Sequence, residues 1–163
     1  MGAFEASFDL RAPPEAVWSF HADPGGLARI TPKPVRVAVD AFEPPLRAGS
    51  RIRLTMGAGP LRSRWELVVT GFDAGVQFVD EQVSGPFARW RHTHRFEPID
   101  GGTRVIDRIE YELPFGRIGR LADALGGRLA MRVLFALRRW STRRLLDRPD
   151  QRLDELDEEV LSQ

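Results

Sequence analysis

An alternation of apolar and polar residues predicts a strand at the start of the chain. Between residues 4 and 11 every even position is apolar and every odd position is polar, the period of a strand with one buried face. Prolines at 13 and 14 then allow a helix to begin, and Val17, Trp18 and Phe20 follow at helical spacing. We therefore predict a short helix that ends near His21 and a second one over residues 27–30.

The next eighty residues read as strands separated by short runs of turn residues. Glycine, proline and aspartate dominate these runs, and six strands joined by short turns describe an antiparallel meander. The predicted strands cover residues 35–42, 50–56, 62–72, 76–83, 87–98 and 103–113.

The period changes after residue 116. Apolar residues now recur every three or four positions, and arginines fill the other face, so we predict one long amphipathic helix. Gly126-Gly127 should bend or break it, and Pro149 should end it. We expect its apolar row to pack against the sheet; the row consists of Ile118, Leu121, Leu125, Leu129, Val133, Leu137 and Trp140.

Together these elements predict one α+β domain over residues 1–148 and an acidic tail over residues 149–163. A seven-stranded antiparallel sheet needs a cover on one face, and the last helix is the only element large enough. Twisted sheets curl, so a space should remain between sheet and helix, and it would serve as a ligand cavity. In the tail, Leu153, Leu156 and Val160 either extend the helical structure or fray.

Composition removes several classes of function. The chain has no cysteine, which excludes disulfides, thiolate metal sites and cysteine nucleophiles. Its first residues lack the pattern of a secretory leader, and no stretch approaches the roughly 18 apolar residues of a spanning helix. We therefore expect a cytoplasmic protein without stable membrane insertion.

The C-terminal third is split in charge. Residues 117–148 carry nine basic and two acidic side chains, whereas residues 149–163 carry one and six. A solvated arginine face beside an acidic tail is the simplest interpretation, and transient contact with an anionic membrane surface is the open variant. Nucleic-acid binding has no support, because no reading motif or exposed aromatic residue accompanies the arginines.

Two stretches carry a resemblance to a known superfamily. They are the early P-x-E-x-V-W-x-F, residues 13–20, and the later GPF…W…H…F…GT…D…Y…LP-G, residues 85–116. With the order of elements, they resemble the START-like helix-grip superfamily (SRPBCC), which includes polyketide cyclases/dehydratases and lipid-transfer domains. The resemblance covers residues 3–147 and implies a curled sheet around a C-terminal helix, with a hydrophobic ligand between them. It names no ligand.

The stretch FARWRHTHRFEP, residues 87–98, holds the most informative side chains. Its odd positions include three arginines and should face solvent, so Trp90, His92 and His94 should share the inner face. On the next strand the corresponding argument turns Asp107 and Tyr111 inward. An inward carboxylate is costly unless it is paired, and a histidine would supply the partner.

The hairpin register decides which residues meet. A two-residue turn at Asp100-Gly101 places His94 opposite Asp107, and a longer loop places it opposite Ile109. We predict a buried pair of His94 and Asp107 in either case, extended by His92 and Tyr111.

Other cavity residues follow from strand faces. Trp65 should share a buried face with Leu67 and Val69, and on strand 76–83, which is ambiguous, we favour Phe78 and Gln82 facing in. The predicted ligand-binding set is thus Trp65, Phe78, Gln82, Trp90, His92, His94, Asp107 and Tyr111.

Three chemistries suit such a site. Binding of a hydrophobic molecule such as a lipid, quinone or polyketide is the interpretation we favour, with no cofactor and no metal. An acid/base pair of His94 and Asp107 could instead serve a cyclase or dehydratase. A metal site of His92, His94 and Asp107 is the weakest option, because His-x-His alone is common. The ligand and the oligomeric state are left open.

Overall fold

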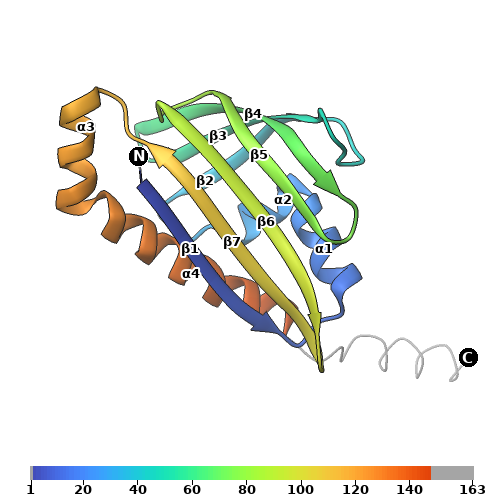
Figure 1. Ribbon diagram of the computed structural model, residues 1–163. Helices are drawn as coiled ribbons and strands as arrows, with labels where there is room; N and C mark the ends of the chain where they lie inside the picture. The colour runs from blue at the N-terminus through green and yellow to red at the C-terminus, as the bar shows by residue number, and fades with distance from the viewer. Residues whose placement is uncertain (1, 148–163) are drawn as a thin grey trace, which may run out of the picture.

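The computed structural model describes residues 2–147, which form one sheet of seven antiparallel strands with helices on its concave side (Figure 1). The strand order is β1-β7-β6-β5-β4-β3-β2, so every strand but β1 lies beside its neighbour in sequence. The strands are β1 (Gly2–Leu10), β2 (Arg36–Phe42), β3 (Arg51–Ala58), β4 (Leu61–Asp73), β5 (Gln77–Ser84), β6 (Arg89–Ile99) and β7 (Gly102–Glu112).

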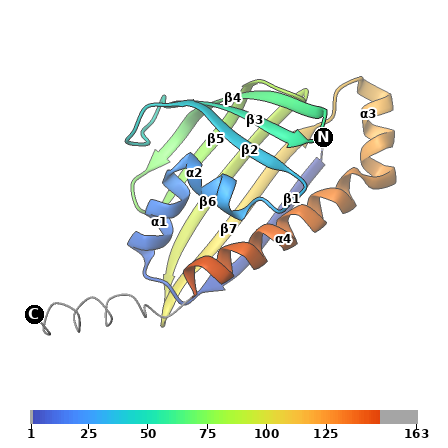
Figure 2. The same ribbon diagram turned by 180° about the vertical axis from the view of Figure 1, so that it is seen from behind.

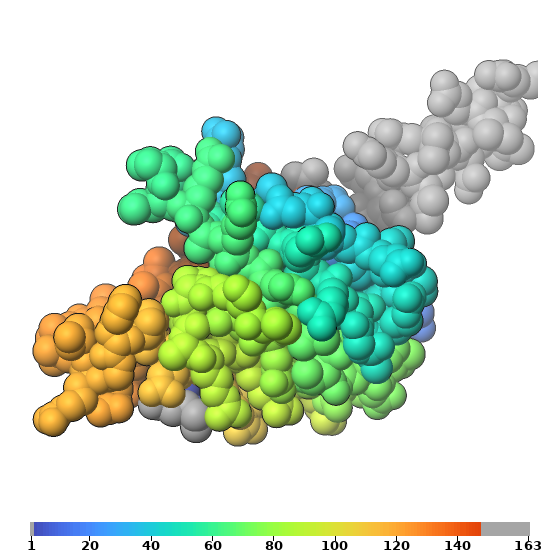
Figure 3. All heavy atoms as spheres, turned by 90° about the horizontal axis from the view of Figure 1, so that it is seen from above, coloured from blue at the N-terminus to red at the C-terminus, as the bar shows by residue number. Residues whose placement is uncertain are grey.

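The helices cover the concave side in two groups. Figure 2 shows α4 (Arg128–Leu146) crossing that side. The helices α1 (Pro14–Ala22) and α2 (Pro24–Ile30) lie together beside it, where α1 contacts β6 and α2 contacts β2. Before α4 come α3 (Gly116–Ala122) and a π-helical turn, η1 (Asp123–Gly127). The predicted bend at Gly126-Gly127 lies in this turn, and α3 projects beyond the body of the molecule (Figure 3).

These elements confirm the predicted helix-grip fold. Every predicted strand and both short helices are present, with boundaries that differ by a few residues. The acidic tail predicted to begin at residue 149, with its leucines and valine, lies outside the described residues. Within the described range 2–147, no helix has the length and apolar character needed to cross a membrane.

The turn between β6 and β7 sets the register of the central hairpin. Ile99 pairs with Gly102, so Asp100 and Gly101 form the two-residue connection. Gly101 has φ of 74°, a left-handed conformation that glycine adopts without steric cost. His94 therefore lies opposite Asp107, as the shorter of the two predicted loops requires.

The inner faces of the strands form the core. On β4, Trp65, Leu67 and Val69 are all buried, as predicted. The inner faces of β6 and β7 are also as predicted. Trp90 and Phe96, at even positions, are buried on β6, and Val105, Ile109 and Tyr111, at odd positions, are buried on β7.

The rotation of the last helix differs from the prediction. The apolar row that should have packed on the sheet is exposed: Leu125 is 79% exposed and Trp140 is 58% exposed, and the remaining members are all more than 40% exposed. The residues that α4 buries are instead Met131, Phe135, Arg138 and Thr142. The expectation that the leucine-rich face covers the sheet, with all arginines on the other face, is therefore wrong.

Two contacts with the sheet, one at η1 and one in the middle of α4, explain this rotation. Tyr111 on β7 donates a hydrogen bond of 2.6 Å to the buried carboxylate of Asp123, which directs that side of η1 to the sheet. The wider π-helical turn then shifts the residues that face the sheet. Further along, Phe135 packs between Phe4 and His92, with ring centroids 5.2 and 5.7 Å away.

Candidate functional site

A cavity of about 180 Å³ lies between the sheet and the three helices α1, α2 and α4. Most of its wall is apolar or aromatic, including Trp65, Phe78, Trp90, Met131 and Phe135. Polar groups interrupt this wall at a few positions, which are His21, Asp80, His92, His94, Asp107, Arg138, Arg139 and Thr142. A mainly apolar cavity with a few polar groups is the general form of a small-molecule site.

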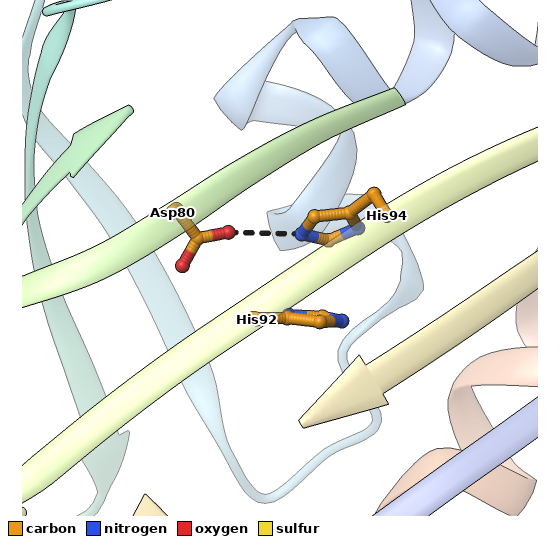
Figure 4. A group of neighbouring side chains, drawn as sticks. All are labelled: Asp80, His92 and His94. Carbon is orange, nitrogen blue, oxygen red and sulfur yellow. Dashed lines mark hydrogen bonds and ion pairs between the residues drawn. The ribbon is translucent and has the colours of Figure 1, made fainter. Parts of the chain in front are cut away.

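The two histidines lie side by side on the concave face of β6. Their ring centroids are 3.7 Å apart, and Figure 4 shows the rings lying one above the other. Phe78 of β5 stacks on His94 from the other side, with centroids 4.3 Å apart. The alternation of β6 points both imidazoles into the cavity, because residues two apart on a strand share a face.

Each histidine bonds a carboxylate on a neighbouring strand, along the diagonal of the ladder. His92 Nε2 lies 2.9 Å from Asp107 Oδ1 on β7, and His94 Nε2 lies 2.9 Å from Asp80 Oδ2 on β5 (Figure 4). The predicted pair of His94 and Asp107 is present as an ion pair across the two strands, with His94 Nδ1 3.4 Å from Asp107 Oδ1. The shorter bond of His94 to Asp80 was not predicted.

The two carboxylates stay ionised in this setting. Burial would raise the pKa of Asp107, but the hydrogen bond from His92 and the nearby His94 outweigh it and hold the pKa well below its usual range. Burial likewise opposes ionisation of Asp80, and the hydrogen bond from His94 reverses the effect and lowers its pKa. Two buried negative charges therefore face the histidines.

The histidines differ in charge. Burial would lower the pKa of His94, yet Asp107 and Asp80 on either side outweigh it and raise the pKa to about 9. For His92, burial and the positive charge of His94 lower the pKa despite the bond to Asp107. At neutral pH His94 is thus an imidazolium and His92 is neutral.

A third histidine belongs to the same cavity. His21, near the end of α1, is held by its Nδ1, which lies 2.8 Å from the carbonyl oxygen of Val17. Burial lowers its pKa to about 4, so it is neutral at pH 7. The ring packs 5.0 Å from that of Phe96.

Arg138 brings a second positive charge from α4. Its side chain is 9% exposed and lies over the ring of Phe135, with Cζ 5.3 Å from the ring centroid. Burial lowers its pKa to about 10, and the carboxylates of Asp107 and Asp80 partly offset that effect. Arg138 therefore remains charged at neutral pH.

The structure brings most of the predicted site residues together. Trp65, Phe78, Trp90, His92, His94 and Asp107 all line the cavity. Two do not: Gln82 bonds the backbone of Phe87, and Tyr111 bonds Asp123. Gln82 instead fixes the connection between β5 and β6, and Tyr111 fixes η1.

Five polar lining residues were not predicted: His21, Asp80, Arg138, Arg139 and Thr142. Asp80 shares the face of Phe78 and could have been found from that choice, because the alternation that turns Phe78 inward also turns Asp80 inward. No simple signal marked His21 as a cavity residue, since the end of a short helix can face either way. Arg138 was missed because it lies on the less apolar side of α4.

Asp80, His92 and His94 also form a group whose side chains could together hold a metal ion. One ligand atom from each lies within 4.8 Å of the others, so the third member differs from the predicted Asp107. The nitrogen and oxygen that join His94 to Asp80 are already bonded to each other, and an ion would have to replace that bond and the proton in it.

Comparison with known proteins agrees with this architecture. Residues 10–138 match the family described as "Polyketide cyclase / dehydrase and lipid transport". The chain belongs to this family. Its membership supports a coarse role, either hydrophobic-ligand binding or polyketide-cyclase-like activity. None of the curated protein sequences matches the chain.

Solved structures share the fold over nearly the whole chain. A protein from Thermus thermophilus is 26% identical, with a TM-score of 0.70, and the match covers 88% of this chain and 95% of that one. A protein from Chromobacterium violaceum is 16% identical, with a TM-score of 0.73 and coverage of 91% and 100%. A START superfamily protein from Mycobacterium smegmatis is 13% identical, with a TM-score of 0.65 and coverage of 89% and 97%. These similarities confirm the START-like helix-grip fold.

Proposed function

We propose that this family member binds a hydrophobic or amphipathic small molecule in the cavity between the sheet and α4, as a carrier or a sensor. The observation that carries the proposal is a mainly apolar cavity interrupted by one buried His–Asp cluster. The apolar wall would hold the body of the ligand, and the polar groups would orient a hydrogen-bonding group such as a carbonyl or hydroxyl. Lipids, quinones and polyketides are the ligand classes that fit this description.

A binding measurement with a neutral probe tests this proposal. Octan-1-ol should bind the purified protein in calorimetry, and native mass spectrometry of fresh protein should show a bound small molecule. Leu134→Trp narrows the cavity and should weaken probe binding, whereas Leu129→Trp, the same change on the exposed side of α4, should not. Absence of probe binding to the unaltered protein, or equal binding by both variants, would contradict the proposal.

A second candidate is catalysis of the cyclase or dehydratase type. Asp107 is ionised, so the Nε2–H of neutral His92 must donate to it, which leaves the lone pair of His92 Nδ1 available as a base. His94, a neighbouring imidazolium, could return a proton as an acid. A base oriented by a carboxylate beside an acid suits removal of a proton next to a carbonyl group and loss of water.

His92→Gln distinguishes catalysis from binding. If the protein is an enzyme, the variant should lose conversion of a poly-β-ketoacyl thioester analogue, followed by chromatography and mass spectrometry. If it is a carrier, the unaltered protein gives no product either, and the variant changes only affinity or stability. Conversion that is equal in the variant and the unaltered protein would exclude His92 as the base.

The outer side of the C-terminal helices supports transient contact with an anionic membrane surface, from which a ligand could be loaded. Its exposed apolar row is larger than the isolated apolar residues of ordinary surfaces. Between residues 116 and 147 no acidic side chain is fully exposed, so the charge favours anionic lipid over a second copy of this chain. The exposed arginines are Arg117, Arg120, Arg128, Arg132, Arg139, Arg143 and Arg144.

Vesicle sedimentation tests this contact. The protein should bind vesicles of phosphatidylcholine with phosphatidylglycerol and should not bind vesicles of phosphatidylcholine alone. Leu129→Ser should weaken binding, and Leu61→Ser, which alters a leucine 82% exposed on β4, should not. A dimer that Leu129→Ser converts to a monomer, without any vesicle binding, would overturn the membrane proposal and assign the row to a second copy.

A further inference from the structure

Three buried side-chain nitrogens have no hydrogen-bond partner within residues 2–147: Trp65 Nε1, His94 Nδ1 and Arg138 Nε. They come from β4, β6 and α4, yet all three residues line the same cavity. Buried polar groups are nearly always bonded, because burial without a partner sacrifices their hydration. His94 Nδ1 still lies 3.4 Å from Asp107 Oδ1 in an ion pair, but no ion pair of the described chain involves Trp65 Nε1 or Arg138 Nε. Two unmet groups from opposite walls of one cavity indicate that a ligand supplies the partners.

Arg138 is the more demanding of the two. A buried guanidinium normally pairs with a carboxylate, but no ion pair joins Arg138 to any residue of the described chain. The two nearby carboxylates are engaged elsewhere, since Asp107 accepts from His92 and Asp80 accepts from His94. The contact of Arg138 with the ring of Phe135 satisfies none of its N–H groups.

Both unmet groups are donors. The indole of Trp65 and the guanidinium of Arg138 can only donate. His94 donates through Nε2 to Asp80, and its Nδ1 faces Asp107 in the ion pair of 3.4 Å. The missing partner must therefore bring acceptors, and a carboxylate, with two acceptor oxygens in one plane, fits the fork of an arginine.

The size of the cavity limits the rest of the ligand. Its volume is about 180 Å³, and an apolar cavity of roughly 150 Å³ is enough to hold benzene. Drug-sized ligands usually occupy roughly 300–1,000 Å³, so the space favours a single ring or a short chain.

We infer that the ligand is a compact hydrophobic carboxylic acid, whose carboxylate pairs with Arg138 and whose apolar part lies against the aromatic wall of the cavity. This inference rests on the proposed binding function and narrows it to one chemical class. Trp65 would donate to an acceptor oxygen of the same ligand.

Calorimetry with matched acids and alcohols tests the inference. Octanoate and 3-phenylpropanoate should bind the unaltered protein more tightly than octan-1-ol and 3-phenylpropan-1-ol. Arg138→Met keeps an unbranched apolar side chain but removes the guanidinium, and it should weaken acid binding roughly ten- to a hundredfold while sparing the alcohols. Arg132→Met, an exposed position on α4 outside the cavity lining, is the control and should change neither. Equal loss for acids and alcohols, or no loss for either, would overturn the inference.

Thermal unfolding gives an independent result. Because Arg138 Nε has no partner among residues 2–147, Arg138→Met should raise the melting temperature without ligand. Octanoate should raise it further for the unaltered protein but not for the variant. A lower melting temperature of ligand-free Arg138→Met would show that Arg138 stabilises the fold and would contradict the anchoring role. Arg138→Lys, which keeps the charge and loses the fork, should retain part of the acid binding.

The outcomes separate this inference from the broader function. An unaltered protein that binds neither the acids nor the alcohols would contradict the proposed binding function itself. An unaltered protein that binds the alcohols as tightly as the acids would leave that function standing and overturn only the carboxylic acid assignment.

Discussion

On α4, polar residues are buried against the sheet and a row of apolar residues is exposed, the reverse of the usual arrangement in an amphipathic helix. The side toward the sheet buries a cation and a hydroxyl, Arg138 and Thr142, beside Met131 and Phe135. The side toward solvent exposes a leucine-rich row that ends at Trp140. A helix that only covered a core would place these sets the other way round. The comparison indicates that the inner side is built around a cavity and a ligand, and that the outer side is available for contact with another surface.

The largest expected effect concerns stability. Phe135→Ala should lower the free energy of unfolding by about 3–5 kcal/mol, because Phe135 is 4% exposed and packs between Phe4 and His92. Val133→Ala, on the exposed side two residues away, should cost less than about 0.5 kcal/mol. Urea denaturation of both variants measures the difference. Similar losses would show that the outer side is also covered in solution.

The second effect is pH dependence, which should arise on the inner side. His94 has a pKa raised from 6.5 to about 9, so its contribution is fully present below pH 6.5 and is lost as pH rises through 9. The loss should be on the order of 3 kcal/mol. His21 has a pKa lowered to about 4, so its contribution is present above pH 6.5 and is lost as pH falls toward 4. Stability should therefore peak near pH 6.5.

Urea midpoints measured from pH 4 to pH 10 check this profile. His94→Gln should flatten the alkaline decline, and His21→Gln should flatten the acidic one. Leu129→Ser removes no titrating group, so it should leave the profile unchanged. An alkaline decline that persists in His94→Gln would place the responsible group elsewhere.

The smallest expected effect is the change in stability when a contact on the outer side of α4 is removed. Arg144 lies over the ring of Trp140, with Cζ 4.7 Å from the ring centroid, and both side chains are exposed. Trp140→Leu should cost about 0.5–1 kcal/mol, the usual range for an exposed cation–π contact. A double-mutant cycle with Arg144→Gln measures the coupling. A coupling near zero would show that the arginine is free to meet a different surface.

Much of the sheet could be predicted because its signals are local. Strand faces follow from a period of two, and the Asp100-Gly101 turn sets the pairing of His94 with its neighbour across the hairpin. Both histidines and Asp107 were therefore placed on the cavity face. Contacts of Asp107 with both histidines were also anticipated. The bond of His94 to Asp80 was not predicted, since Asp80 lies on a strand whose inner face was ambiguous.

The last helix could be predicted as an element but not in its orientation. Its period of 3.6 marks a helix whichever side faces in. Its rotation depends on the bond between Tyr111 and Asp123, twelve positions apart in sequence, and on the π-helical turn between α3 and α4. Neither feature has a sequence signature strong enough to override the count of apolar residues.

By itself, the amino-acid sequence determined the order of the elements, the faces of the central strands and the inward direction of His92, His94 and Asp107, because these depend on spacing along a regular backbone. Tertiary structure alone decided that His94 donates to Asp80 and that Arg138 Nε lies buried without a partner among the residues described. Those outcomes depend on which distant groups meet in space, and they give the cavity its chemical preference.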